Sequence, residues 1–115
     1  MDTKELVELR KELFSQIEII MDLKGKEYSG KIDRLANFKR NGNNLGLPPE
    51  SIWAVYCGKH WDSLMSFIRE IGEGKDIEEI EKNLSEPING RILDIITYLI
   101  LLQGLIQERR FSCQP

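Results

Sequence analysis

The sequence predicts an all-α fold: a helical bundle of three long helices and one short helix, with a long structured basic loop. Three observations support this prediction. Apolar residues recur at spacings of three and four in three long segments, residues typical of helix starts and stops flank those segments, and no alternating strand pattern of useful length occurs. With 115 residues and an apolar fraction of 41%, the chain is expected to form a single helical domain, residues 1–115.

The first helix is predicted over residues 3–24. Asp2 or Thr3 can cap it, Glu5 lies in its first turn, and Gly25 weakens it at the far end. Its apolar residues form a single stripe: Leu6, Leu9, Leu13, Ile17, Ile20 and Leu23.

The second long helix is predicted over residues 50–72, after Pro48–Pro49 and before Gly72 and Gly74. Its stripe has helical spacing and consists of Trp53, Tyr56, Cys57, His60, Leu64, Phe67, Ile68 and Ile71. Asp76 can cap a short, mostly exposed acidic helix over 77–84.

The last helix is predicted over residues 87–109, with a flexible tail over 110–115. Besides an inner apolar stripe it has apolar residues on other faces, among them Leu93, Ile100 and Leu101. We therefore expect it to be buried on most sides, either at the centre of a bundle or in the interface of a homo-oligomer, to which Trp53 or Trp61 could contribute.

Composition indicates a cytoplasmic protein. The first residues are charged, which is not typical of a signal peptide, and the most apolar run, Ile95–Leu102, is too short to cross a bilayer. Cys57 and Cys113 have no metal-ligand spacing and are expected to be free thiols in a reducing compartment.

The segment predicted as a loop, residues 24–49, concentrates positive charge. Residues 24–40 carry six basic and two acidic side chains, whereas the whole chain has a net charge of −3. A chain that repels long polyanions but has one positive segment fits a small phosphorylated ligand better than duplex nucleic acid. The alternative is that this segment is only a solvated loop. Within it, DRLANFK (residues 33–39) could form one or two turns of helix, with Leu35 and Phe38 facing inward.

Three groups of residues could form a binding site. Lys24, Arg34, Lys39 and Arg40 of the loop can donate to phosphate, Tyr28 and Phe38 can stack on a base, and Asn37 can read a base edge. The second group is His60 with its neighbours Lys59 and Ser63. The third is Arg91, Asp94 and Tyr98, which share one face of the last helix. The alternatives are a core histidine with a backbone or tyrosine partner, and an internal Arg–Asp pair.

Four stretches in order, KGKEY, DRLANFKR, LGLPPESIWAVYCGKHWDS and GRILDIITYLILLQGLIQE, resemble a group of small phage and prophage helical proteins of unassigned function. The similarity covers residues 20–108. The matching positions are Lys24, Glu27, Tyr28, Asp33, Arg34, Asn37, Phe38, Lys59, His60, Ser63, Asp94 and Tyr98.

That group is distantly similar to the MazG-like all-α nucleoside triphosphate pyrophosphohydrolases, helical bundles that oligomerise. The resemblance implies magnesium held by E-x-x-E and E-x-x-D patterns. Asp94 matches the final acid, but Arg91 stands where the pattern has Glu, and no E-x-x-E lies close to the pocket segments.

We therefore expect a phage-type protein that binds a phosphorylated nucleotide-type ligand. The expected role is that of a sponge, which sequesters a nucleotide immune signal to counter bacterial defence without cleaving it. This role requires no cofactor, no duplex nucleic acid and no membrane. The alternative is a Mg²⁺-dependent pyrophosphohydrolase with Glu27 and Asp94 as metal ligands, and a third possibility is a structural or regulatory phage protein without a small ligand.

Overall fold

The computed structural model describes residues 1–28, 33 and 35–112, and this part of the chain forms five helices without a β-strand. The all-α prediction is confirmed. In chain order the helices are α1 (Thr3–Tyr28), α2 (Ala36–Leu45), α3 (Pro49–Gly72), α4 (Ile77–Glu81) and α5 (Ile88–Ser112).

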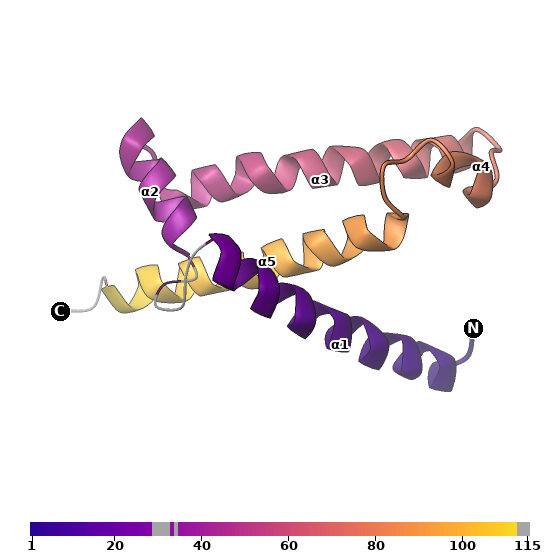
Figure 1. The fold of residues 1–115 in the computed structure, drawn as a ribbon, viewed down its shortest axis with the longest axis horizontal. Helices are drawn as coiled ribbons and strands as arrows, with labels where there is room; N and C mark the ends of the chain where they lie inside the picture. Colours follow the sequence, from indigo (N-terminus) through magenta and orange to yellow (C-terminus); the bar gives the residue numbers. More distant parts are fainter. Residues whose placement is uncertain (29–32, 34, 113–115) are drawn as a thin grey trace.

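The centre of the fold is the antiparallel pair of α3 and α5 (Figure 1). Helix α2 packs across the beginning of α3, and α4 reverses the chain at the opposite end of the pair. Helix α1 contacts α5 and runs in the same direction, but it diverges from α5 toward the N-terminus. The result is elongated, with a radius of gyration of 16.9 Å.

Helix α1 begins with a reciprocal cap. The backbone N–H of Glu5 donates to Asp2 Oδ1 at 2.8 Å, and the backbone N–H of Asp2 donates to Glu5 Oε2 at 2.9 Å. The helix continues four residues beyond the predicted end at 24. The reason is that an isolated glycine such as Gly25 costs only about 1 kcal/mol in a helix interior, and good helix formers surround it.

The predicted loop 24–49 is not confirmed, because α1 extends into it and α2 occupies Ala36–Leu45. Before α2, Asp33 Oδ1 accepts a hydrogen bond from the backbone N–H of Leu35 at 2.9 Å. After it, Gly46 has a φ of 69°, in the left-handed region, and the N–H of Leu47 donates to the carbonyl of Gly42 at 2.9 Å. A left-handed glycine and a hydrogen bond of this kind are the usual features of a helix C-terminus.

The other helices are close to prediction. Helix α3 begins at Pro49. A proline is tolerated there because N–H groups in the first turn of a helix have no intrahelical acceptor. The helix ends at Gly72, before Gly74 with its φ of 89°. Helix α4 is short and mostly exposed as expected, but Ile80 anchors it with 1% of its surface exposed. Helix α5 runs to Ser112, so the predicted tail begins as helix.

The main core lies where α2, α3 and α5 meet. Leu35, Phe38, Ile52 and Leu105 are buried there. Half-buried side chains cover this cluster: Trp53, Tyr56, Tyr98 and Leu101. Leu101, which the sequence placed outside the inner apolar stripe of the last helix, therefore packs on the core.

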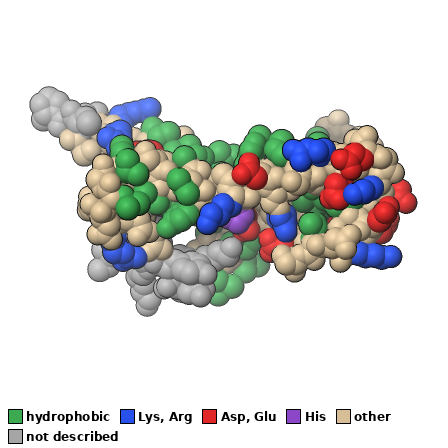
Figure 2. All heavy atoms as spheres, turned by 90° about the horizontal axis from the view of Figure 1, so that it is seen from above, with side chains coloured by type: hydrophobic (Ala, Val, Ile, Leu, Met, Phe, Trp, Pro, Cys, Tyr) green, Lys and Arg blue, Asp and Glu red, His purple; other side chains and the backbone are tan. Residues whose placement is uncertain are grey.

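Helix α5 is less buried than expected. Leu99 is 52% exposed, and Ile92, Ile100 and Ile106 are also exposed. By length and composition this helix could cross a membrane, and 22% of its most apolar stretch is buried. One such helix is weak evidence for a membrane span. In Figure 2, acidic side chains gather at the end of the molecule where α4 lies, while apolar side chains spread over other parts of this surface.

Candidate functional site

His60 of α3 and Asp94 of α5 face each other across the helix pair. The distance from His60 Nδ1 to Asp94 Oδ2 is 3.6 Å, and the two side chains are 30% and 13% exposed. The ring of Tyr98 lies beside that of His60, with 5.1 Å between the ring centroids. Asp94 and Tyr98, which share one face of α5, thus both lie next to His60.

Helix geometry explains this meeting. Trp53 and His60 are seven residues apart, and so are Asp94 and Leu101, so each pair lies on one side of its helix. The indole N–H of Trp53 donates to the carbonyl of Tyr98 at 2.5 Å, which fixes the register of the two helices. Because the helices are antiparallel, this register places His60 opposite Asp94.

Arg91 lies one turn before Asp94 on the same face of α5. Its side chain is half-buried, and its Nε is buried without a hydrogen-bond partner among the described residues. An unsatisfied buried donor normally costs about 1–3 kcal/mol. The Arg91 guanidinium therefore has capacity to donate to an additional acceptor.

Lys59 and Ser63 flank His60 on α3, with Lys59 exposed and Ser63 half-buried. Lys24, Glu27 and Tyr28 belong to α1, but their side chains are not described, and Arg34 lies outside the described residues. The predicted roles of these four side chains therefore have no structural counterpart here. Among the predicted residues, the structure brings together those of α3 and α5.

Phe38 does not occupy the predicted role. It is 5% exposed, and its ring packs against Tyr56 and Tyr98 at centroid distances of 6.1 and 6.4 Å. The expectation that Leu35 and Phe38 face inward is confirmed, and the expectation that Phe38 stacks on a base is wrong, because its ring is part of the core. The phenol oxygen of Tyr56 accepts a hydrogen bond from Asn41 Nδ2 at 3.0 Å, which ties α2 to α3.

Asn37 and Lys39 of α2 already have protein partners. Asn37 Oδ1 accepts a short hydrogen bond from Arg40. Lys39 Nζ lies 2.9 Å from Asp33 and 2.7 Å from Glu108. The hydrogen bonds to Glu108 and then Asp33 raise the pKa of Lys39, and the bond from Lys39 is the largest cause that lowers the pKa of Asp33.

These ion pairs place Lys39 and Asp33 away from His60. Glu108 is 14 residues beyond Asp94 on α5, about 21 Å at 1.5 Å per residue. The predicted set is therefore divided between two places. One is the α3–α5 seam, which we define as the contacts made by Trp53, His60, Asp94 and Tyr98, and the other is the end of α5.

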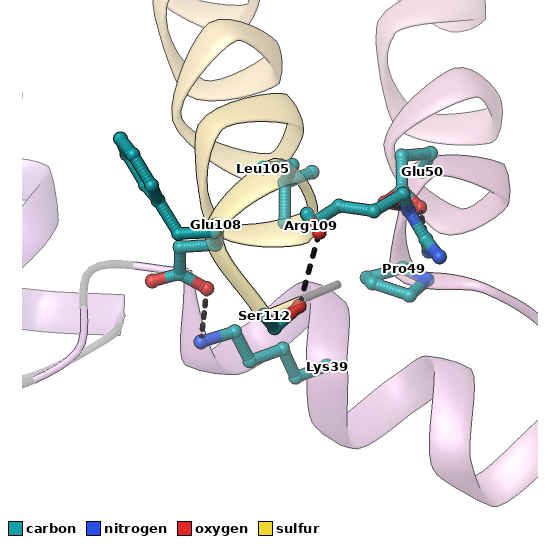
Figure 3. A pocket seen from close by; sticks show the side chains of 8 residues that line it. Lys39, Pro49, Glu50, Leu105, Glu108, Arg109 and Ser112 are labelled. Carbon is teal, nitrogen blue, oxygen red and sulfur yellow. Dashed lines mark hydrogen bonds and ion pairs between the residues drawn. The ribbon is translucent and has the colours of Figure 1, made fainter. Parts of the chain in front are cut away.

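An open pocket of about 620 Å³ lies at that second place (Figure 3). Two ion pairs border it: Lys39 with Glu108, and Arg109 with Glu50, whose carboxylate accepts bonds of 2.9 and 2.6 Å. The bond from Arg109 lowers the pKa of Glu50. Because the charged groups of this pocket are already paired with one another, we place the candidate site at the α3–α5 seam and not at the pocket.

Sequence reasoning missed the Glu50–Arg109 pair. Both residues were visible, one in the first turn of α3 and the other in the last turns of α5. Two antiparallel helices of similar length bring such ends together, so the signal was available once the pairing of these helices was assumed.

The described residues contain no group of three or more His, Cys, Asp or Glu side chains that could hold a metal ion. Of the two ligands expected for magnesium, Asp94 lies in the seam, and the side chain of Glu27 is outside the described set.

The chain matches no protein-family model, no curated protein and no solved structure. The phage-protein and MazG-like relationships therefore stay predictions from the sequence.

Proposed function

We propose that the chain binds a small phosphorylated nucleotide-type ligand at the α3–α5 seam and sequesters it without cleavage. The observation that carries this proposal is the meeting of His60 and Asp94 beside Arg91, whose buried Nε has no hydrogen-bond partner among the described atoms. A fork of N–H donors with spare capacity is the group that proteins use to bind phosphate.

The surroundings of this cluster support the same chemistry. Tyr98 and His60 present ring surface, and the exposed Lys59 adds a positive charge beside them. The net charge of −3 disfavours long polyanions but leaves room for a compact ligand that one or two cations can neutralise.

The biological role in this proposal is that of a phage-type sponge acting in the host cytoplasm, where it removes a nucleotide immune signal. Sequestration requires tight binding and slow release, but no metal and no general acid. A cluster in which one carboxylate orients a histidine and an arginine contacts phosphate is sufficient for that purpose.

The test begins with the purified protein and a panel of nucleoside triphosphates, cyclic nucleotides and ADP-ribose-derived nucleotides, each with and without magnesium. Native mass spectrometry identifies bound ligands, and chromatography after denaturation shows whether they are intact. Recovery of intact ligand supports sequestration. Magnesium-dependent formation of a nucleoside monophosphate and pyrophosphate would instead support the pyrophosphohydrolase alternative with Glu27 and Asp94 as ligands.

A matched pair of variants locates the site. Arg91→Gln removes the guanidinium at the seam, whereas Arg69→Gln removes an exposed one on the same helix as His60. The proposal requires weaker binding by the first variant and unchanged binding by the second. Equal binding by both would place the ligand elsewhere.

A further inference from the structure

The α3–α5 pair has one apolar side that no described helix covers. Trp61 and Ile68 of α3 and Ile92, Leu99 and Ile106 of α5 are each between 37% and 52% exposed. We call these five residues the bare face. On α5 they recur every seven residues, so they form a continuous stripe along the helix.

The two stripes lie on the same side of the pair. At about 100° per residue, each member of the bare face is rotated by roughly 70–140° from the seam residues of its own helix, in the direction of increasing residue number. Because the helices are antiparallel, equal rotations from the seam lead to the same side. Helix α2 contacts the opposite side, where Tyr56 meets Asn41 and Glu108 meets Lys39.

The accessible surface area shows how much more surface this molecule exposes than a compact monomer of the same mass. It is 8402 Å², whereas a compact monomer of this mass exposes about 6,500 Å², so the excess is about 1,900 Å². A stable dimer needs about 800 Å² from each partner. The bare face, together with the surface around it, can supply that amount.

The chemistry of the pair favours a protein partner over lipid. Helix α5 is tied to α3 through Asp94 and Tyr98, and α3 carries exposed charges at Lys59, Asp62 and Arg69. If α5 entered a bilayer, either these charged side chains would move into the hydrocarbon region, which is energetically costly, or the contacts of the seam would break. At one end the bare face is bordered by the Glu50–Arg109 ion pair, and a polar border around an apolar centre is typical of protein interfaces.

We propose that the bare face binds the bare face of a second copy of this chain. The two α3–α5 pairs then form an antiparallel four-helix arrangement around a two-fold axis, with Leu99 and Trp61 near its centre. This inference does not depend on the ligand proposed for the seam.

The test is sedimentation velocity of the full chain at about 1–50 μM, a range in which an interface of standard size is occupied. Wild type should sediment as a dimer. Leu99→Glu should sediment as a monomer with an unchanged circular dichroism spectrum, because a dimer would bury its charge. Val55→Glu is the matched control: Val55 is 60% exposed on α3, but it points away from the bare face, so this variant should stay dimeric.

A second measurement tests the same interface without a charged substitution, so its result does not depend on whether Leu99→Glu folds. In Trp53→Phe protein, Trp61 is the remaining tryptophan, and dilution should shift its emission to longer wavelength as the dimer dissociates. A wild-type monomer throughout the concentration range, or dissociation by Val55→Glu as well as Leu99→Glu, would overturn the proposal. So would a monomer that co-sediments with phosphatidylcholine vesicles, since lipid would then be what covers the face.

Discussion

The imidazole of His60 and the carboxylate of Asp94 lie 3.6 Å apart across the pair of helices α3 and α5. Asp94→Asn keeps the shape of this side chain but removes its charge. If the seam sequesters a ligand, the variant should bind more weakly by about 1.5–3 kcal/mol, the usual value of a hydrogen bond to a charged group. Isothermal titration with the ligand found in the nucleotide panel measures the change.

The same variant distinguishes binding from catalysis. In a pyrophosphohydrolase, Asp94 would hold magnesium, so Asp94→Asn would abolish turnover and leave nucleotide affinity largely intact. Lost turnover with unchanged affinity would therefore contradict the sponge and support the enzyme.

Lys59→Ala should lower ligand affinity by about 1.5–3 kcal/mol because a charged hydrogen bond to phosphate is lost. Its melting temperature should hardly change, since Lys59 is exposed. Arg69→Ala, ten residues after Lys59 on α3, is the control with unchanged affinity. Normal binding by Lys59→Ala would place the ligand elsewhere.

Gly42 allows α2 to approach the turn that leads into α3. A Cβ at this position would lie 2.6 Å from the carbonyl oxygen of Leu47 and 3.3 Å from the nitrogen of Pro49, both backbone atoms. Gly42→Ala should therefore destabilise the fold by about 1–3 kcal/mol. Urea denaturation measures this loss. Gly72→Ala, where a Cβ meets nothing within 4 Å, should be nearly neutral.

The two tryptophans should respond differently to substitution. Trp53→Phe loses the hydrogen bond from the indole to the carbonyl of Tyr98, and we expect a loss of about 0.5–1.5 kcal/mol in unfolding free energy. In dilute solution Trp61→Phe, at an exposed position, should change stability much less. Equal losses would indicate that the hydrogen bond from Trp53 to the carbonyl of Tyr98 contributes nothing to the unfolding free energy.

Acid should remove the contribution that two paired carboxylates, those of Asp33 and Glu50, make to folding stability. Bonds from Lys39 and Arg109 lower the pKa of Asp33 and of Glu50 below their ordinary values of 3.8 and 4.5. A lowered folded-state pKa adds stability above the unfolded-state value, and this stability is lost as pH falls through the folded-state value. The raised pKa of Lys39 has the opposite sign: its contribution is complete below 10.5 and is lost as pH rises beyond the folded-state value.

The melting temperature of Glu50→Gln should therefore lie below that of wild type at pH 7, and the difference should shrink as the pH is lowered through about 4 toward 2. Glu8→Gln, at an exposed position on α1, serves as the control. A difference that persists unchanged at pH 2 would show that Glu50 stabilises α3 by some route other than its charge.

The long helices could be predicted because their apolar stripes extend over several turns, and one stripe placed His60 on the side that meets α5. Only one or two turns of α2 could be predicted, over residues 33–39, because Gly42, Asn43 and Asn44 are poor helix formers. The glycine after Leu45 and the prolines at 48 and 49 nevertheless marked a helix end. Phe38 was assigned to the ligand because sequence spacing does not show that α2 folds back onto α3. Glu108, which pairs with Lys39, and Arg109, which pairs with Glu50, each lie more than 55 residues further along the chain. These two ion pairs therefore depend on how the helices pack, which the local sequence pattern does not show.

The divergence of α1 from α5 has a consequence for local stability. Gln16 contacts Asn89, the second residue of α5, so the residues of α1 before Gln16 extend past the beginning of the helix that supports them. That segment depends on its cap at Asp2 and Glu5 and on its own helix propensity. Its amide protons should therefore exchange with solvent through fraying, many times faster than those of α3, and a protease should cut this segment first while the rest of the fold stays intact.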